Sequence, residues 1–229
     1  MQNKIDKNYK RIIDALKEAT PKAEDLKGMT AMVNEMKSVY EAIPPLIKTM
    51  QLNNLGLRSR EIAELVNAGK LTRIKQGYYQ MADHSDIISE AQIIGQLYPD
   101  GVICMETALF YYGYGDRTPL AWNIAIDRNA SKAKFNIDYP SVQPHYIEKK
   151  HLEYGITDAD YGDCTLKIFD KDRLICECIK NENKMDREAY NKAIQAYIND
   201  NEKNIANLLD YAERRNIHKR VKERIGIWL

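Results

Sequence analysis

The spacing of apolar residues predicts an α+β protein, and this spacing changes three times along the chain. Up to residue 69 apolar side chains recur every three or four positions, as in helices. Residues 71–81 hold two strand-like runs, and from residue 83 helical and extended runs alternate before the chain becomes helical again. With 229 residues, of which 44% are hydrophobic, the chain can bury a core in one large or two small domains. We expect two.

Helical spacing begins at the N-terminus. It predicts helix over residues 1–43, interrupted at Pro21 and ended by Pro44 and Pro45. Because proline is favoured at the first position of a helix, a short helix is predicted over residues 46–52.

A further helix is predicted from Arg58 to Asn67. A turn containing Gly56 precedes it, and Gly69 follows it in the position of a C-terminal cap. The apolar residues that this helix turns inward are Ile62, Leu65 and Val66.

A β-hairpin is predicted next, with strands at residues 71–75 and 78–81. Gly77 between them supplies the positive φ that a tight turn requires. Helix, helix, Gly-containing turn, helix and hairpin within about fifty residues form the plan of a winged helix-turn-helix. We therefore expect this domain over residues 29–82, after a helical extension at residues 1–28.

The second domain is expected over residues 83–229, with its boundary at 83–86, as a mixed α+β domain that ends in a helical tail. Helical spacing and strict alternation distinguish its elements. The expected elements are helices at 87–97 and 104–112, a strand at 121–127, extended runs at 145–148 and 165–169, and three helical stripes: Ala189, Ala193, Ile194 and Tyr197; Ile205, Leu208, Leu209 and Ala212; Ile217, Val221, Ile225 and Trp228.

Charge is concentrated in the helix and hairpin of the first domain. Residues 58–80 hold five Lys and Arg against two Glu, a net charge of +3, although the whole chain carries only +1. A winged helix-turn-helix meets DNA with the N-terminus of this helix and with the hairpin. The candidate DNA-binding residues are Arg58, Ser59, Arg60, Asn67, Arg73, Lys75 and Gln76.

Each candidate suits a particular contact. Arg58 and Arg60 can contact guanine edges, and the hydroxyl and amide groups on the helix can hydrogen-bond to bases. Arg73 and Lys75 can bind phosphate, and Gln76 at the hairpin tip can reach a minor groove. The alternatives are an ordinary solvated face and a protein–protein module.

Two later segments carry opposite charge. Residues 83–127 have a net charge of −6, and residues 211–229 have +4. The second segment is either another DNA-contacting patch or a solvated face that satisfies the acids of its own domain. The bases of this second basic patch are Arg214, Arg215, Lys219, Arg220, Lys222 and Arg224.

Enzymatic chemistry has little support in the sequence. Asp127 and Glu148 with Lys150 imitate a metal-dependent nuclease site, but Glu-x-Lys is too common to carry weight. The histidines and cysteines match no zinc spacing, and Cys176 and Cys178, placed on one face of a strand, are expected to be buried. We expect no enzyme activity, catalytic residue, metal or cofactor.

The sequence also bears on the cellular compartment. The apolar runs fall short of the ~18 residues that a membrane span needs, and the charged N-terminus lacks the apolar region of a secretory signal. Four cysteines without a C-x-x-C pair fit a reduced environment. We expect a cytoplasmic protein without a membrane partner.

Three motifs resemble the AbiEi-type abortive-infection antitoxins, a family of transcriptional regulators. The hairpin resembles their wing, and residues 104–113 resemble the helix after their linker. Residues 169–177 resemble their Asp-x-Asp/Glu-Arg-Thr segment, although Leu174 replaces the usual Thr and Glu177 a common Asp. Residues 1–28 have no counterpart. The wing residues are Gly69, Leu71, Arg73, Ile74, Gly77, Tyr78 and Tyr79.

This resemblance implies an antitoxin that represses its own operon by binding inverted repeats of operator DNA. It implies a nucleotidyltransferase-like toxin as functional partner, without implying a direct complex, and the sequence leaves a homodimer open. A protein-binding antitoxin or adaptor with minor DNA binding is the alternative, and a metal-dependent nuclease is third.

Overall fold

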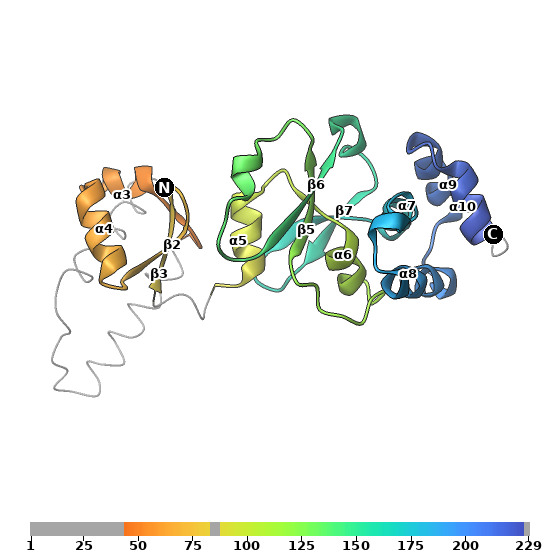
Figure 1. Cartoon of the computed structure of the whole chain (residues 1–229), viewed down its shortest axis with the longest axis horizontal. Coiled ribbons are helices and arrows are strands. Elements are labelled where there is room, and N and C mark those ends of the chain that lie inside the picture. Colours follow the sequence, from red (N-terminus) through yellow and green to blue (C-terminus); the bar gives the residue numbers. More distant parts are fainter. Residues whose placement is uncertain (1–43, 83–87, 227–229) are drawn as a thin grey trace. The chain divides into compact units, whose positions relative to one another are not determined.

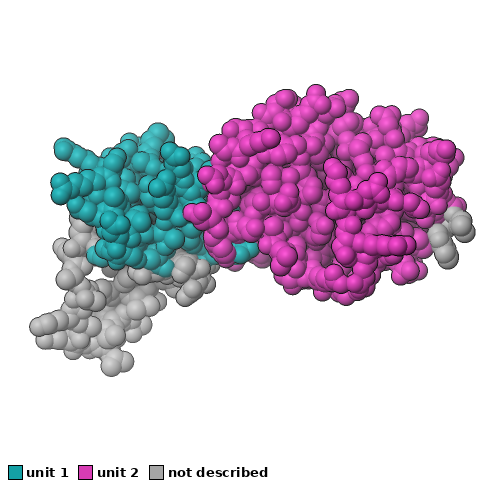
Figure 2. Space-filling view, viewed as in Figure 1, with its two compact units in different colours: residues 1–96 teal, residues 97–229 magenta. Residues whose placement is uncertain are grey.

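The computed structural model describes residues 44–82 and 88–226, which form two compact units (Figures 1 and 2). The division falls between Gln96 and Leu97, whereas the sequence placed the boundary at 83–86. The helices expected over 1–43, the extension at 1–28 and the segment 83–87 lie outside the described residues.

The described residues of the first unit form two helices, a three-stranded antiparallel sheet of order β1-β3-β2, and most of a third helix, α5. Its helix from residue 59 and its hairpin confirm the predictions for these segments. The element bounds are β1 Ile47–Lys48, α3 Thr49–Asn54, α4 Ser59–Asn67, β2 Leu71–Lys75, β3 Tyr78–Met81 and α5 Glu90–Leu97.

The helix predicted over 46–52 begins three residues later than expected. Ile47 and Lys48 form β1 because they pair with Tyr79 and Tyr78 of β3, and the helix starts only at Thr49. This pairing is non-local, so helical spacing alone could not indicate it.

Apolar side chains from every element of residues 44–82 form the core of the first unit. Leu65 and Val66 are half-buried against it, which confirms the inward face predicted for α4. Gly56 and Gly69 take φ of +89° and +69° at the ends of the two helices, as a chain reversal there requires. The buried cluster comprises Ile47, Leu52, Leu57, Ile62, Leu71 and Met81.

The second unit is built on a five-stranded mixed sheet of order β6-β5-β4-β8-β7 (Figure 1). The pairs β5–β6 and β4–β8 are parallel, and β4–β5 and β7–β8 are antiparallel. The strands are β4 Val102–Ile103, β5 Trp122–Asp127, β6 Val142–Ile147, β7 Ile156–Asp160 and β8 Thr165–Phe169. The strand predicted at 121–127 and the run at 165–169 are confirmed, whereas β4 was not anticipated.

The helices of the second unit confirm the predicted helix at 104–112 and the helical tail. Their bounds are α6 Met105–Tyr111, α7 Lys171–Lys180, α8 Arg187–Asn199, α9 Ile205–Arg214 and α10 His218–Ile225. Eight consecutive residues of α7, 172–179, are buried, so this helix is central to the unit. In the described part of the chain, no helix is long and apolar enough to cross a membrane.

The prediction that Cys176 and Cys178 lie on a strand is wrong, since both belong to α7. On a helix two residues apart point in different directions, so the thiols do not share a face. Both side chains are buried, as expected, and burial raises the pKa of both thiols.

Candidate nucleic-acid interface and sites of the second unit

The candidate DNA-binding residues lie on the outside of the first unit, away from its core. Ser59, Arg60 and Asn67 are exposed on α4, and Arg58 is exposed immediately before it. The remaining candidates come from the hairpin: Arg73 and Gln76 are exposed, whereas Lys75 is half-buried. The fold thus brings cations of the helix N-terminus and of the hairpin onto one small module.

Local hydrogen bonds fix where α4 begins and how the hairpin meets α3. The backbone N–H of Arg58 donates to Glu61 Oε2 at 2.8 Å, which satisfies a free donor at the helix start. The N–H of Thr49 donates to the carbonyl of Gly77 at 2.9 Å. The hairpin turn is therefore tied to the start of α3 rather than free to swing.

Arg60 has an acidic neighbour on the outer face of α4. Its Nε lies 3.1 Å from Glu64 Oε1, and 91% and 63% of the two side chains are exposed. Exposed pairs one helical turn apart are weak. A phosphate or a guanine edge can therefore take the place of Glu64, whose own charge would then face the DNA.

If α4 faces DNA, as the sequence predicts, replacing Glu64 by glutamine should strengthen binding about two- to fivefold, because one negative charge near the phosphates is lost. Fluorescence anisotropy with a labelled duplex from the upstream region of the gene measures this. Glu213→Gln, which removes an exposed charge from the second unit, is the matched control. Equal affinities of the two variants would argue against α4 as the DNA-facing helix.

In the second basic patch, Arg215 does not lie on the outer face where the sequence placed it. This residue is only 6% exposed, and its guanidinium binds both carboxylate oxygens of Glu177, at 2.6 and 2.9 Å. The assignment of Arg215 to an exposed patch is therefore wrong. It directly follows α9 and turns inward against α7, where a buried acid needs a counter-ion.

Most of the other bases in this patch pair with acids of their own unit. Arg220 and Arg224 both bind Glu182, and the hydrogen bond from Arg224 lowers the pKa of that carboxyl. Arg214 lies 2.9 Å from Asp210, and Lys219 lies 4.0 Å from Glu223. Lys222 is exposed. These contacts favour a solvated, internally balanced face over a second DNA contact.

The residues that imitate a nuclease site are engaged in other contacts. Asp127 and Ile147 are register partners in β5 and β6, so Glu148 follows close to Asp127. However, Glu148 binds Arg128 at 3.2 Å and Lys150 at 3.0 Å. Within residues 44–82 and 88–226, no three His, Cys, Asp or Glu side chains are placed to hold a metal ion.

The segment at residues 169–177 contributes to a buried charge cluster that sequence reasoning did not foresee. Arg173 is fully buried, with its guanidinium over the rings of Tyr154 and Phe169 at 4.4 and 4.7 Å. Its Nη2 lies 2.7 Å from Glu177 Oε1, so Glu177 binds Arg173 and Arg215 at once. We call Arg173, Glu177 and Arg215 the buried charge triad.

The acids at the start of α7 are also structural. Asp170 caps the helix by accepting from the Arg173 N–H at 2.7 Å, and it accepts the Tyr211 hydroxyl at 3.0 Å. Asp172 accepts the Tyr197 hydroxyl at 2.7 Å. The segment thus joins α7 to α8 and α9. The one sequence signal was an Arg and a Glu four residues apart, with only apolar residues between them.

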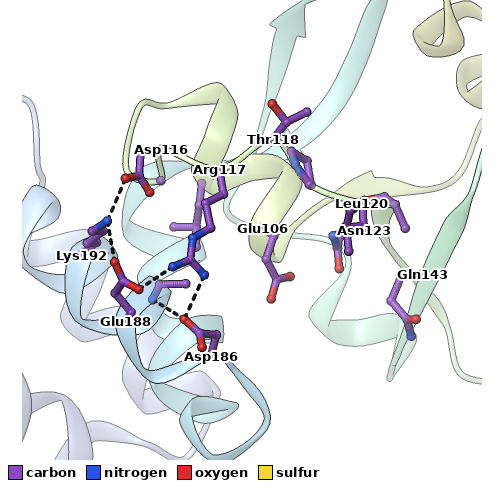
Figure 3. Close-up of a pocket in the computed structure, with 15 residues that line it drawn as sticks. Glu106, Asp116, Arg117, Thr118, Leu120, Asn123, Gln143, Asp186, Glu188 and Lys192 are labelled. Atoms are coloured by element: carbon purple, nitrogen blue, oxygen red, sulfur yellow. Dashed lines mark hydrogen bonds and ion pairs between the residues drawn. The ribbon is translucent and has the colours of Figure 1, made fainter.

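A groove of about 360 Å³ lies on the second unit (Figure 3). α6, α8, the loop at 115–121 and the adjoining strands β5 and β6 line it. One wall is a network of ion pairs in which Arg117 and Lys192 bind acids of the loop and of α8. Sequence reasoning did not identify this groove, since its walls come from segments about 70 residues apart.

No protein-family model matches the chain, and no curated protein matches it significantly.

Proposed function

We propose that this protein is a DNA-binding transcriptional regulator whose first unit is a winged helix-turn-helix. One observation carries the proposal: exposed cations at the start of α4 and on the hairpin lie on a module that has its own buried apolar core. Between residues 44 and 82 the chain has six Lys and Arg against two Glu. Such a concentration of positive charge suits a polyanion.

The order of elements supports the same proposal. Strand, helix, helix and hairpin follow one another from β1 to β3, as they do in a winged helix-turn-helix after its first helix. The residues before Pro44, for which the sequence predicts helix, lie outside the described part of the chain. In the proposed mechanism α4 enters the major groove with its N-terminus, where Arg58 and Arg60 contact bases, and the hairpin holds the backbone through Arg73.

The biological role that we propose is that of an antitoxin. It would repress its own operon by binding inverted repeats and counteract a nucleotidyltransferase-like toxin, with the second unit needed for that antagonism. This part of the proposal rests on the resemblance of three motifs to the AbiEi-type family. A nucleotidyltransferase-like gene beside this one would support it, and its absence would count against it.

The double variant Arg58→Ala/Arg60→Ala is expected to weaken binding to the upstream duplex about ten- to a hundredfold. Its salt dependence should fall as well, because fewer counterions are released. Affinity measured by anisotropy at several salt concentrations tests both effects.

The control for this experiment is Arg128→Ala/Arg187→Ala, which removes the same charge from exposed positions of the second unit. The control should bind like the unmodified chain. If both double variants bind with equal affinity and equal salt slope, α4 is not the reading element and the proposal fails.

A protein-binding adaptor is the second candidate function, and the groove of the second unit is the observation that favours it. A stoichiometric partner that co-purifies and survives high salt would favour the adaptor over the regulator, since DNA contacts weaken steeply with salt. For the nuclease, the corresponding test is Mg²⁺-dependent cleavage that Glu148→Ala abolishes.

A further inference from the structure

We propose that the groove of the second unit binds an arginine side chain presented by a partner protein, with Glu106 as counter-ion and Leu120 as the adjoining apolar contact. This proposal does not depend on DNA binding by the first unit. It rests on the charge of the groove, on its apolar lining and on the exposure of its rim.

The ion-pair network at one wall leaves negative charge in excess. Lys192 lies 2.8 Å from Asp116 and 2.9 Å from Glu188, and Arg117 binds Glu188 and lies 3.7 Å from Asp186. Two cations therefore face three carboxylates. With Glu106 added, the lining carries four acids and two bases, a net charge of −2.

Glu106 is the carboxylate that its surroundings do not neutralise. It projects from α6 into the space between the ion-pair network and the amide side chains of Asn123 and Gln143 (Figure 3). Among the described residues it has neither a hydrogen-bond nor an ion-pair partner, and its side chain is half-buried. A carboxylate in such a recess attracts a cation more strongly than one in open water.

Part of the groove lining is apolar, which favours a long cationic side chain over a bare ion. A methylene stem can lie along these residues while its charged head reaches the carboxylate. Arginine fits better than lysine because its planar guanidinium can donate two parallel hydrogen bonds to one carboxylate. The apolar residues of the lining are Leu109, Pro119, Leu120, Ala121 and Ala189.

The rim of the groove points to a protein as the source of the arginine. Leu120 is 99% exposed, the largest exposure of any large apolar side chain in the described chain. A small guanidinium compound that fills the groove would leave Leu120 in water, whereas a protein surface carrying the arginine would cover it. Covering this side chain would add apolar burial to the ion pair at Glu106.

The proposal is tested by NMR titration of the ¹⁵N-labelled full chain with the peptide acetyl-Leu-Arg-Leu-amide at low ionic strength. Saturable shifts are expected at groove amides, such as those of Leu109, Gln143 and Ala189. The same peptide with citrulline in place of arginine is neutral and nearly isosteric. It should bind at least tenfold more weakly.

Variants separate the roles of the two key side chains. Glu106→Gln should lower the affinity for the arginine peptide at least tenfold and leave the affinity for the citrulline peptide unchanged. The control Glu153→Gln, at an exposed glutamate away from the groove, should change neither affinity. Leu120→Ala should lower the affinity for the arginine peptide about threefold or more, without changing the affinity for free arginine amide.

Three results would overturn the proposal: no shifts in the groove, equal binding of the arginine and citrulline peptides, or an unchanged affinity in Glu106→Gln. Binding of free arginine amide as tight as that of the peptide, unaffected by Leu120→Ala, would assign the groove to a small guanidinium compound and overturn the partner protein. The citrulline comparison remains decisive even if Glu106→Gln fails to fold.

Discussion

Replacement of Glu177 by alanine is expected to destabilise the second unit by about 3–5 kcal/mol, the range for breaking a buried ion pair from one side. Glu177 is 2% exposed and holds two arginines that are themselves buried. Without it, Arg173 and Arg215 would face each other as like charges with no counter-ion in reach. The loss therefore exceeds that of a surface pair.

Tryptophan fluorescence during urea unfolding measures this change, because Trp122 and Trp228 both belong to residues 97–229. Glu188→Ala is the control, since Glu188 also binds two cations, Arg117 and Lys192, but on the surface. We expect a change of less than about 1 kcal/mol for the control. Equal midpoints for Glu177→Ala and Glu188→Ala would contradict the structural role of the triad.

A triple variant separates the cost of the unpaired charges from the loss of packing. If Arg173 and Arg215 are changed to methionine together with Glu177→Leu, no charge of the triad remains, and much of the stability lost in Glu177→Ala should return. A triple variant as unstable as Glu177→Ala would show that the aromatic stacking of Arg173, rather than charge pairing, dominates at this position.

The substitution Gly155→Ala is expected to destabilise the second unit by about 2–4 kcal/mol, the sum of backbone strain and overpacking. Gly155 has a φ of +65°, and an added Cβ would lie 2.7 Å from Cβ and 2.8 Å from Cγ of Arg173. These atoms are the base of a fully buried side chain, whose guanidinium lies over the rings of Tyr154 and Phe169. They therefore have little room to move. Cε2 of Tyr211 would lie 3.3 Å from the added Cβ, which is also a tight contact.

Gly113→Ala is the matched control for Gly155→Ala. Gly113 has a φ of +70°, nearly the same backbone conformation, but an added Cβ would meet nothing within 4 Å. Gly113→Ala should therefore lower the free energy of unfolding by the backbone strain alone, about 1–2 kcal/mol. The difference between the two unfolding free energies isolates the contact with Arg173, and a difference near zero would show that the neighbourhood of Arg173 can yield.

The buried charge triad changes the interpretation of the segment at residues 169–177. From sequence its acids and its arginine resembled a family motif without an assigned role, and Glu177 was a departure from the common Asp. In the structure Glu177 reaches two guanidiniums at 2.6–2.9 Å, one from its own helix and one from the residue after α9. A shorter aspartate would not span both from the same backbone position. The length of this side chain therefore matters for joining α7 to the C-terminal helices.

Local patterns were sufficient to predict most helices and the hairpin. The apolar face of α4 was predicted correctly, as was the turn at Gly77, because helix period and turn chemistry depend on neighbouring residues. The apolar stripe predicted for α10 was also correct, since its residue Val221 is fully buried. The expectation failed where a short strand gained its hydrogen bonds from distant residues, as in β1 and β4.

The sequence by itself thus determined most of the described helices, the hairpin, and the apolar side of elements such as α4 and α10. Only the tertiary structure decided which charged groups meet: Arg215 and Glu177 are 38 residues apart, and the loop around Arg117 binds acids about 70 residues later in α8. Apolar periodicity is fixed by backbone geometry within a few turns, whereas ion pairing depends on how the chain crosses itself. For this reason the sequence left two interpretations open for the basic tail, a DNA-contacting patch and a solvated face, whereas the folded chain pairs most of its bases with acids of the same unit and brings the acids of the groove together.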